Sequence, residues 1–378
     1  MNYNIEPIFV MFPLICLFFH ITNIKTSKWL HFILIVSFIL IYPFSLNGSD
    51  IDGYRQHYTM VEYGASVEDN AQEIGYYYLM KLAVNLGWDY LTFRVILLST
   101  LAIVLFYSIR KLTDDLPLSM FFISTMFVIY TISAYRQFIV IAFSIWWLYQ
   151  YGCGRKLKAI IGTSLLLLFH VTAILPLGCM VYKWYSTKSR LEKSTNRFKR
   201  YFTIIIFSTI IIRIAMNFLL ETGIVNAIMR NVLGAHASPD PTLFSFGLIS
   251  RMFFLFFITY LYRASGTEDG MIRLLFWYYF VSITLYIAVP LEFFMGRLMN
   301  NANILSAALI PMLRKDIVYG NRLHDVRVKG KTVILITVIL EVLALTILIN
   351  QLANQNGYTP YLNLLFGDSI VVFPIIKP

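Results

Sequence analysis

Long apolar runs alternate with short polar connections along this chain. Runs such as 5–22, 29–46, 91–109 and 333–349 each approach the roughly 20 apolar residues with which a helix spans a bilayer. Backbone in lipid must satisfy its own hydrogen bonds, and a helix does so within one segment. The pattern therefore predicts an all-α fold, a polytopic transmembrane helix bundle with about 12 crossings. The predicted crossings cover residues 5–23, 29–46, 91–109, 117–134, 137–151, 158–169, 171–184, 201–220, 245–262, 272–290, 297–313 and 332–350.

Two of these segments, 158–169 and 171–184, are short and adjoin each other at His170. Read as one helix, they would place the basic loop 183–200 on the opposite side from every other basic loop. Read as two opposed half-helices, they keep that loop on the common side, and Pro176 favours a break because it lacks a backbone donor. We therefore predict a broken helix pair that turns near His170, with its irregular backbone buried in protein or facing a water-filled cavity.

Basic residues settle the predicted sidedness. Most of the 31 Lys and Arg residues fall in connections that this topology places on one side. Because short basic loops stay in the cytoplasm, loops 183–200 and 314–331 are predicted to be cytoplasmic and segment 47–90 to lie outside. Both termini are then non-cytoplasmic. The same bias accounts for the net charge of +11, so nucleic-acid binding is not expected.

Composition excludes a soluble domain and offers no cofactor site. Hydrophobic residues make up 58% of the chain and charged residues 13%, too few charges to cover a globular surface. Residues 1–378 are predicted to form a single integral membrane domain. The 3 cysteines form no CxxC pair, and no phosphate loop, zinc-type cluster or GxSxG elbow is present. No cofactor and no metal are expected. The first run lacks a basic n-region and a cleavage site, so we read it as a retained helix.

Acids and tyrosines gather in the outer segment 47–90. Two short motifs carry them, Asp50-x-Asp52-x-Tyr54-x3-Tyr58 and Glu73-x-Gly75-Tyr76. Aromatic faces stack on the CH surfaces of sugar rings, and carboxylates accept hydrogen bonds from hydroxyl groups. The segment therefore favours a sugar-binding surface. The alternative is a solvated acidic loop that interfacial tyrosines anchor at the membrane.

Two arginines stand near the outer ends of predicted helices. Arg136 lies in Tyr135-Arg136-Gln137, between two apolar runs, and Arg297 follows Gly296. An arginine so close to hydrocarbon is costly unless it is paired or hydrated, and its fork suits phosphate oxygens. Both are predicted anion ligands. The alternatives are snorkelling of Arg136 to the headgroups and an ion pair of Arg297 with Glu292.

His170 stands at the predicted turn, in Phe169-His170-Val171-Thr172-Ala173. Its pKa is tunable near neutrality, so an acid, a base or a phosphate ligand is possible at this position. A packed histidine without chemistry is the equal alternative. Other charged residues lie in or beside apolar runs, where spacing assigns them no role and an ion pair between packed helices is one alternative: Arg94, Arg213, Arg251 and Glu341.

Together these elements resemble a known family. The ordered motifs are Asp50-x3-Tyr54-x3-Tyr58, Glu73-x-Gly75-Tyr76, Tyr135-Arg136-Gln137, Phe169-His170-x-Thr172-Ala173, Gly296-Arg297 and Tyr358-x-Pro360-Tyr361. The chain is similar to EpsG-like membrane proteins, a group that overlaps the Wzy-type polymerases of O-antigen and capsule. Thr172 replaces the serine of the usual family pattern and keeps the hydroxyl. The resemblance covers almost the whole chain.

The resemblance implies a membrane glycosyltransferase that polymerises undecaprenyl-pyrophosphate-linked oligosaccharides at the outer leaflet of a bacterial inner membrane. Arg136 and Arg297 would bind the pyrophosphate, and Asp52, Tyr54, Tyr58 and Tyr76 the sugars. Asp50, Glu73 and His170 are alternative bases, with Asp50 first, and Arg136 would stabilise the leaving charge. The partners would be the lipid-linked oligosaccharide, membrane lipid and a chain-length regulator protein. The rival functions are a transporter or flippase of lipid-linked glycan, and an acyltransferase of surface glycans.

Overall fold

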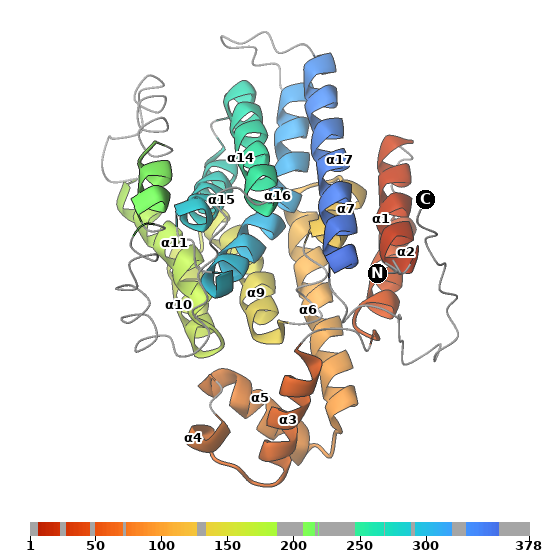
Figure 1. Cartoon of the computed structure of the whole chain (residues 1–378), viewed down its shortest axis with the longest axis vertical. Coiled ribbons are helices and arrows are strands. Elements are labelled where there is room, and N and C mark those ends of the chain that lie inside the picture. Colours follow the sequence, from red (N-terminus) through yellow and green to blue (C-terminus); the bar gives the residue numbers. More distant parts are fainter. Residues whose placement is uncertain are drawn as a thin grey trace.

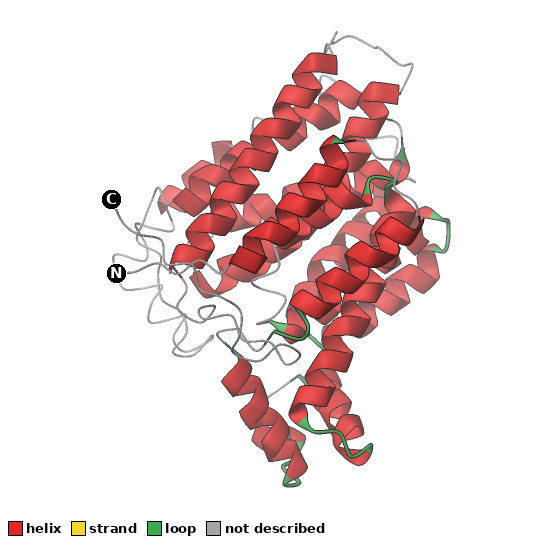
Figure 2. Cartoon of the chain, turned by 90° about the vertical axis from the view of Figure 1, so that its right-hand side faces the viewer, coloured by secondary structure: helices red, strands yellow, loops and turns green. Residues whose placement is uncertain are grey.

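The computed structural model of this chain consists of helices joined by loops and turns (Figure 2). Within the described residues there are fourteen α-helices and no strand. The all-α prediction is therefore confirmed for that part of the chain. The description covers residues 7–22, 28–45, 50–70, 73–126, 134–186, 207–215, 218, 246–267, 269–288, 292–319 and 330–354.

Apolar helices of membrane-spanning length make this a multi-pass membrane protein. Among the described residues, 4 helices are long and apolar enough to cross a bilayer. They are α6 (Tyr90–Leu112), α14 (Phe246–Ser265), α15 (Gly270–Ala288) and α17 (Gly330–Asn354). Each coincides with a predicted crossing to within a few residues. The total of about 12 crossings and the location of the termini stay predictions, because residues 1–6 and 355–378 lie outside the described part.

Further helices fill the bundle around these four (Figure 1). Each of the five overlaps a predicted crossing, and α16 is longer than predicted because it extends beyond both predicted bounds, 297 and 313. Of the predicted crossing 201–220, residues 207–215 are helical and most of the rest lies outside the described residues. The remaining bundle helices are α1 (Pro7–Ile21), α2 (Lys28–Ile41), α7 (Leu116–Met126), α9 (Tyr135–Gly152) and α16 (Glu292–Tyr319).

The helix break at His170 is confirmed. Helix α10 (Lys156–Leu165) leads into two single 3₁₀ turns, η1 (Leu166–Leu168) and η2 (Val171–Ala173), before α11 (Ile174–Ser186) begins. The Thr163 hydroxyl donates to the Met180 sulfur at 3.6 Å, which places the two half-helices against each other. Pro176 lies in the first turn of α11, where its missing N–H costs no intrahelical bond.

The outer segment folds into three short helices beyond one end of the bundle: α3 (Ile51–Glu62), α4 (Val67–Asn70) and α5 (Ile74–Asn85) (Figure 1). Helix α3 is amphipathic, since Tyr54, Tyr58 and Val61 are buried and lie at helical spacing. The chain then enters α6 through Asp89, whose carboxylate accepts a hydrogen bond from the Thr92 amide at 2.8 Å and caps the helix.

Helix α6 joins the two ends of the molecule. Its 23 residues are roughly 35 Å long at 1.5 Å per residue, about the thickness of a bilayer core. Its first turn packs against the outer segment, where the Tyr90 hydroxyl donates to the Ile51 carbonyl at 3.1 Å. Its last turn carries Arg110 and Lys111, close to the Asp114–Lys315 ion pair between the start of α7 and the end of α16. The described start of the basic connection 314–331 thus lies at the opposite end of α6 from the outer segment.

Candidate functional site

An ion pair between Arg136 and Glu73 forms the centre of the site. Arg136 lies in the first turn of α9, and Glu73 is the residue from which α5 starts. The Arg136 guanidinium donates through Nη1 to Glu73 Oε2. The two side chains are 21% and 29% exposed, so the pair is neither sealed in the bundle nor free in solvent. Sixty-three positions separate the partners in sequence, and the fold brings them together at the outer-segment end.

Tyrosine rings enclose this pair. The Arg136 guanidinium carbon lies 5.9 Å from the centre of the Tyr54 ring, a cation–π distance. The Tyr54 ring stacks on Tyr135 at 4.2 Å and meets the edge of Tyr76 at 5.7 Å. Burial raises the pKa of the Tyr54 phenol, Asp50 adds to that shift, and Arg136 opposes it. Four residues from α3, α5 and α9 therefore form one aromatic and cationic cluster.

A chain of hydrogen bonds supports the cluster from below. Arg94 Nε donates to the Tyr135 hydroxyl at 2.7 Å, and Arg94 Nη1 donates to the Pro43 carbonyl at 2.8 Å. The Tyr90 hydroxyl uses its proton on the Ile51 carbonyl, so at 3.2 Å it accepts from Tyr135. Arg94 has no exposed surface. This buried arginine therefore fixes the start of α9, and with it the backbone of Arg136.

Gly75 allows α5 to approach the break at His170. A Cβ at Gly75 would lie 2.8 Å from the Leu168 carbonyl oxygen, closer than real Cβ contacts. His170 is 3% exposed, and its Nδ1 accepts from the Thr172 amide at 3.2 Å. Because an amide N–H only donates, the proton of the neutral imidazole lies on Nε2. The structure thus brings the Glu73 and His170 motifs to the same end of the bundle, with His170 arranged as a donor through Nε2.

The predicted sugar ligands divide between buried and exposed positions. Tyr76 is fully buried and Tyr54 is 7% exposed, with their rings against other rings. The Tyr58 hydroxyl donates to the Trp88 carbonyl at 2.6 Å, and its ring stacks on Phe93. Asp52 faces outward from α3. Of these four predicted ligands, Asp52 is therefore the one with an open surface beside it.

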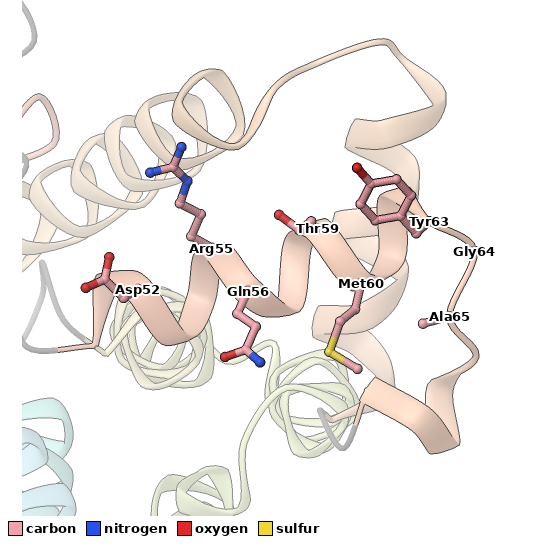
Figure 3. A pocket seen from close by; sticks show the side chains of 8 residues that line it. All are labelled: Asp52, Arg55, Gln56, Thr59, Met60, Tyr63, Gly64 and Ala65. Atoms are coloured by element: carbon pink, nitrogen blue, oxygen red, sulfur yellow. The ribbon is translucent and has the colours of Figure 1, made fainter.

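That open surface is a shallow cavity of about 640 Å³ along the outward face of α3 and the following turn (Figure 3). Tyr63 contributes an 87% exposed ring, and Arg55 and Thr59 add polar groups between it and Asp52. Sequence reasoning missed these residues: their spacing places them opposite Tyr54 and Tyr58 on α3, but spacing alone does not say which face is open. The lining residues are Asp52, Arg55, Gln56, Thr59, Met60, Tyr63, Gly64 and Ala65.

The remaining predicted site residues are Asp50, which the structure describes, and Arg297, of which it describes the helix position. Asp50 is exposed, precedes α3, and its charge reaches Tyr54. Arg297 lies in α16, and its side chain is outside the described residues. Its helix is tied to the site by Asn300, whose amide donates to Gln137 at 2.9 Å next to Arg136. Within the described part of the chain, no three His, Cys, Asp or Glu side chains come together in a way that would hold a metal ion.

Several buried polar atoms of the cluster lack a hydrogen-bond partner among the described residues. They are Arg136 Nε, Arg94 Nη2 and the Tyr76 hydroxyl. Two of the three are cationic donors, and the third can donate. Buried polar groups are normally satisfied, so donors left without an acceptor point to a ligand that brings acceptor oxygens.

Fold and site together define a multi-pass helical membrane protein with an arginine and tyrosine site at the outer-segment end. The family model of the EpsG family matches residues 28–363, most of the chain, and the chain therefore belongs to the EpsG family. This confirms the EpsG-like resemblance of its motifs and links the protein to exopolysaccharide synthesis. No curated protein and no solved structure matches the chain.

Proposed function

We propose that this protein is a glycosyltransferase that polymerises oligosaccharide repeat units carried on undecaprenyl pyrophosphate. The single observation that carries the proposal is the Arg136 cluster: a partly exposed guanidinium with unsatisfied neighbours, at the end of a membrane bundle. A lipid-linked substrate presents its pyrophosphate at the headgroup level, where such a cluster can meet it. The corresponding location is the outer leaflet of a bacterial plasma membrane.

The reaction transfers a glycan from one lipid carrier to another lipid-linked repeat unit. A hydroxyl on the non-reducing sugar of the acceptor attacks the anomeric carbon of the donor glycan. The bond from that carbon to the pyrophosphate oxygen breaks, and undecaprenyl pyrophosphate leaves with the electron pair. Arg136 and Arg297 would stabilise the charge that develops on this oxygen, a contribution of about 10²–10³ in rate for a single donor.

A base has to take the proton of the attacking hydroxyl. Asp50, Glu73 and His170 are the three candidates. His170 Nδ1 already accepts from the Thr172 amide, which favours a donor role for this ring. Glu73 contacts Arg136 directly, whereas Asp50 acts on Tyr54 from an exposed position. These contacts favour Glu73 as the base beside the leaving group.

Sugar recognition falls to α3 and α5 in this proposal. Tyr54, Tyr58 and Tyr76 would shape the sugar site from the buried face of α3, and Asp52 borders the open cavity on its exposed face. A carboxylate, polar side chains and an exposed tyrosine ring suit a sugar with several hydroxyl groups. The proposed partners are the lipid-linked oligosaccharide, membrane lipid and a chain-length regulator protein.

Glycan analysis of a deletion strain tests the proposal. Loss of this protein should leave single repeat units on the lipid carrier, with no ladder of longer chains on a gel. The wild-type gene should restore the ladder, and a variant with Arg136→Ala should insert but not restore it. An unchanged ladder in the deletion strain would exclude the polymerase. Repeat units confined to the inner leaflet would instead identify a flippase, and loss of an acyl group from full-length polymer would identify an acyltransferase.

A further inference from the structure

The ion pair at the centre of the site joins a rigid cation to a less constrained anion. Arg136 is held by the Tyr54 ring and by the start of α9, which Arg94 fixes through Tyr135. Glu73 lies in extended backbone ahead of α5, makes no capping bond with its side chain, and is 29% exposed. Among the described residues, Arg136 is the hydrogen-bond and ion-pair partner of its carboxylate. The carboxylate can therefore rotate away while the guanidinium stays in place.

The guanidinium is incompletely used by this partner. Arginine has five N–H donors in a planar fork, and Glu73 takes a bond from Nη1. Nε of Arg136 is buried without a partner in the described part of the chain. A pyrophosphate group carries more charge and more acceptor oxygens than a carboxylate, and it fits the fork through two parallel bonds. Its two phosphate groups can together satisfy Nε and the Nη1 that Glu73 now occupies, which lie on different edges of the guanidinium.

We propose that Glu73 is a placeholder anion, which the pyrophosphate of the donor displaces from Arg136 and which then becomes the base for the acceptor hydroxyl. The inference rests on the proposed function and deepens it. Once displaced from Arg136, the Glu73 carboxylate has both oxygens free to accept the proton of the acceptor hydroxyl. Donor binding thereby switches on the base, and water is not activated before the donor arrives.

In the chemical step, one proton moves to Glu73 and one electron pair moves to the pyrophosphate. The acceptor oxygen forms the new bond to the anomeric carbon of the donor glycan as its proton moves to a Glu73 carboxylate oxygen. The anomeric carbon–oxygen bond to pyrophosphate breaks, and the electron pair stays on the pyrophosphate held by Arg136. Departure of the lipid pyrophosphate then allows Glu73 to release its proton and return to Arg136.

Binding of undecaprenyl pyrophosphate without a glycan tests the displacement apart from catalysis. The full-length chain, purified in lipid nanodiscs, is compared as wild type, Glu73→Gln and Arg136→Gln, with Glu62→Gln as the matched control. Glu62 is an exposed acid of the same outer segment. Glu73→Gln should bind about tenfold more tightly because the competing charge is gone, Arg136→Gln should lose binding, and Glu62→Gln should match wild type. Unfolding temperatures of all four proteins establish that each is folded.

Turnover with a lipid-linked repeat unit tests the role of Glu73 as the base. Glu73→Gln should lower kcat by about 100-fold while the donor KM falls or stays constant, the split expected when a competitor and a base are one residue. Equal or weaker pyrophosphate binding in Glu73→Gln overturns the placeholder. Tighter binding with an unchanged kcat overturns the role as base. If Glu73→Gln binds the lipid pyrophosphate more tightly but the wild-type protein forms no polymer, the polymerase function is refuted and the displacement stands.

Discussion

Two charged clusters lie near opposite ends of α6, and they are built differently. At the outer-segment end, Arg136 and Glu73 pair beside tyrosines. At the other end, His20 Nδ1 lies 2.8 Å from Asp115, and Arg314 Nη1 lies 2.6 Å from His20 Nε2. Because Arg314 only donates, His20 accepts through Nε2 and donates through Nδ1 to Asp115. The second cluster is a continuous chain from α1 through the residue that precedes α7 to α16.

The two clusters differ in whether their buried polar atoms have hydrogen-bond partners. In the His20 network, Asp115 also lies 3.5 Å from Arg314, and Glu341 of α17 lies 3.7 Å from His20, so both acids have a polar partner. His20 and Glu341 are each 6% exposed. In the Arg136 cluster, buried donors stay without acceptors among the described residues. A satisfied network contributes to rigidity and helix packing, whereas an unsatisfied one costs stability unless a ligand completes it.

The largest expected effect comes from replacing one arginine by glutamine at each of the two ends. Arg136→Gln should lower polymer formation by about 100-fold or more and change the unfolding temperature little, because the charge acts on a ligand. Arg314→Gln should do the reverse and cost about 2 kcal/mol of stability, because it leaves the Asp115 and Glu341 charges without their cation. Ladder assays and thermal unfolding in detergent measure the two quantities.

Specific activity has to be normalised to folded protein in this pair. Activity per folded molecule in Arg314→Gln should stay within about twofold of wild type. A loss of activity in Arg314→Gln at full stability would mean that the His20 network takes part in the reaction, and the contrast between the two ends would fail.

A smaller effect is expected from adding one methyl group at the outer-segment end. Gly75→Ala places a Cβ against the Leu168 backbone, so α5 has to move and Glu73 shifts from Arg136. Overpacking of this kind costs about 1–3 kcal/mol, and we expect roughly a tenfold loss of turnover. Gly53→Ala is the matched control, since nothing lies within 4 Å of its added Cβ. Equal turnover in the two variants would contradict the role of this close approach.

Two tyrosine-to-phenylalanine changes separate support from binding within the open cluster. Tyr135→Phe removes an acceptor from Arg94 and a donor to Tyr90, which should cost about 1–2 kcal/mol of stability. Tyr76→Phe removes a hydroxyl that has no partner in the described residues, so stability should stay equal or rise slightly. Chemical or thermal unfolding distinguishes them. A turnover loss in Tyr76→Phe at full stability would assign its hydroxyl to the ligand.

The sequence predicts elements better than contacts. The break at His170 followed from helix length, Pro176 and the side on which loop 183–200 falls, none of which requires a contact between distant residues. The placement of Arg136 and Glu73 at one end followed from counting crossings. Their direct contact did not, because it joins residues far apart in the chain and depends on how α5 packs. The His20–Arg314 contact spans 294 positions and was beyond reach for the same reason.

Burial of the tyrosines was also outside what a sequence pattern reveals. Tyr54 and Tyr58 share one face of α3, and helical spacing alone indicates that this face differs from the one bearing Asp52 and Tyr63. It does not say which face meets the bundle. Neighbours decide that: Phe93 of α6 and Tyr135 of α9 cover the tyrosine face. The predicted sugar-binding role of these rings therefore remains a proposal, and the exposed face becomes the additional surface to probe.

The smallest expected effect is a pH dependence from His57 on α3. Burial lowers the pKa of His57 below its ordinary value of 6.5, and the Arg136 charge adds to this shift. The folded state then holds fewer protons than the unfolded state, so stability falls as the pH drops through about 6.5. The unfolding temperature should be lower at pH 5.5 than at pH 7.5. This difference should shrink in His57→Asn and should shrink in part in Arg136→Gln. Acid sensitivity that is the same in His57→Asn and wild type would place its origin in another group.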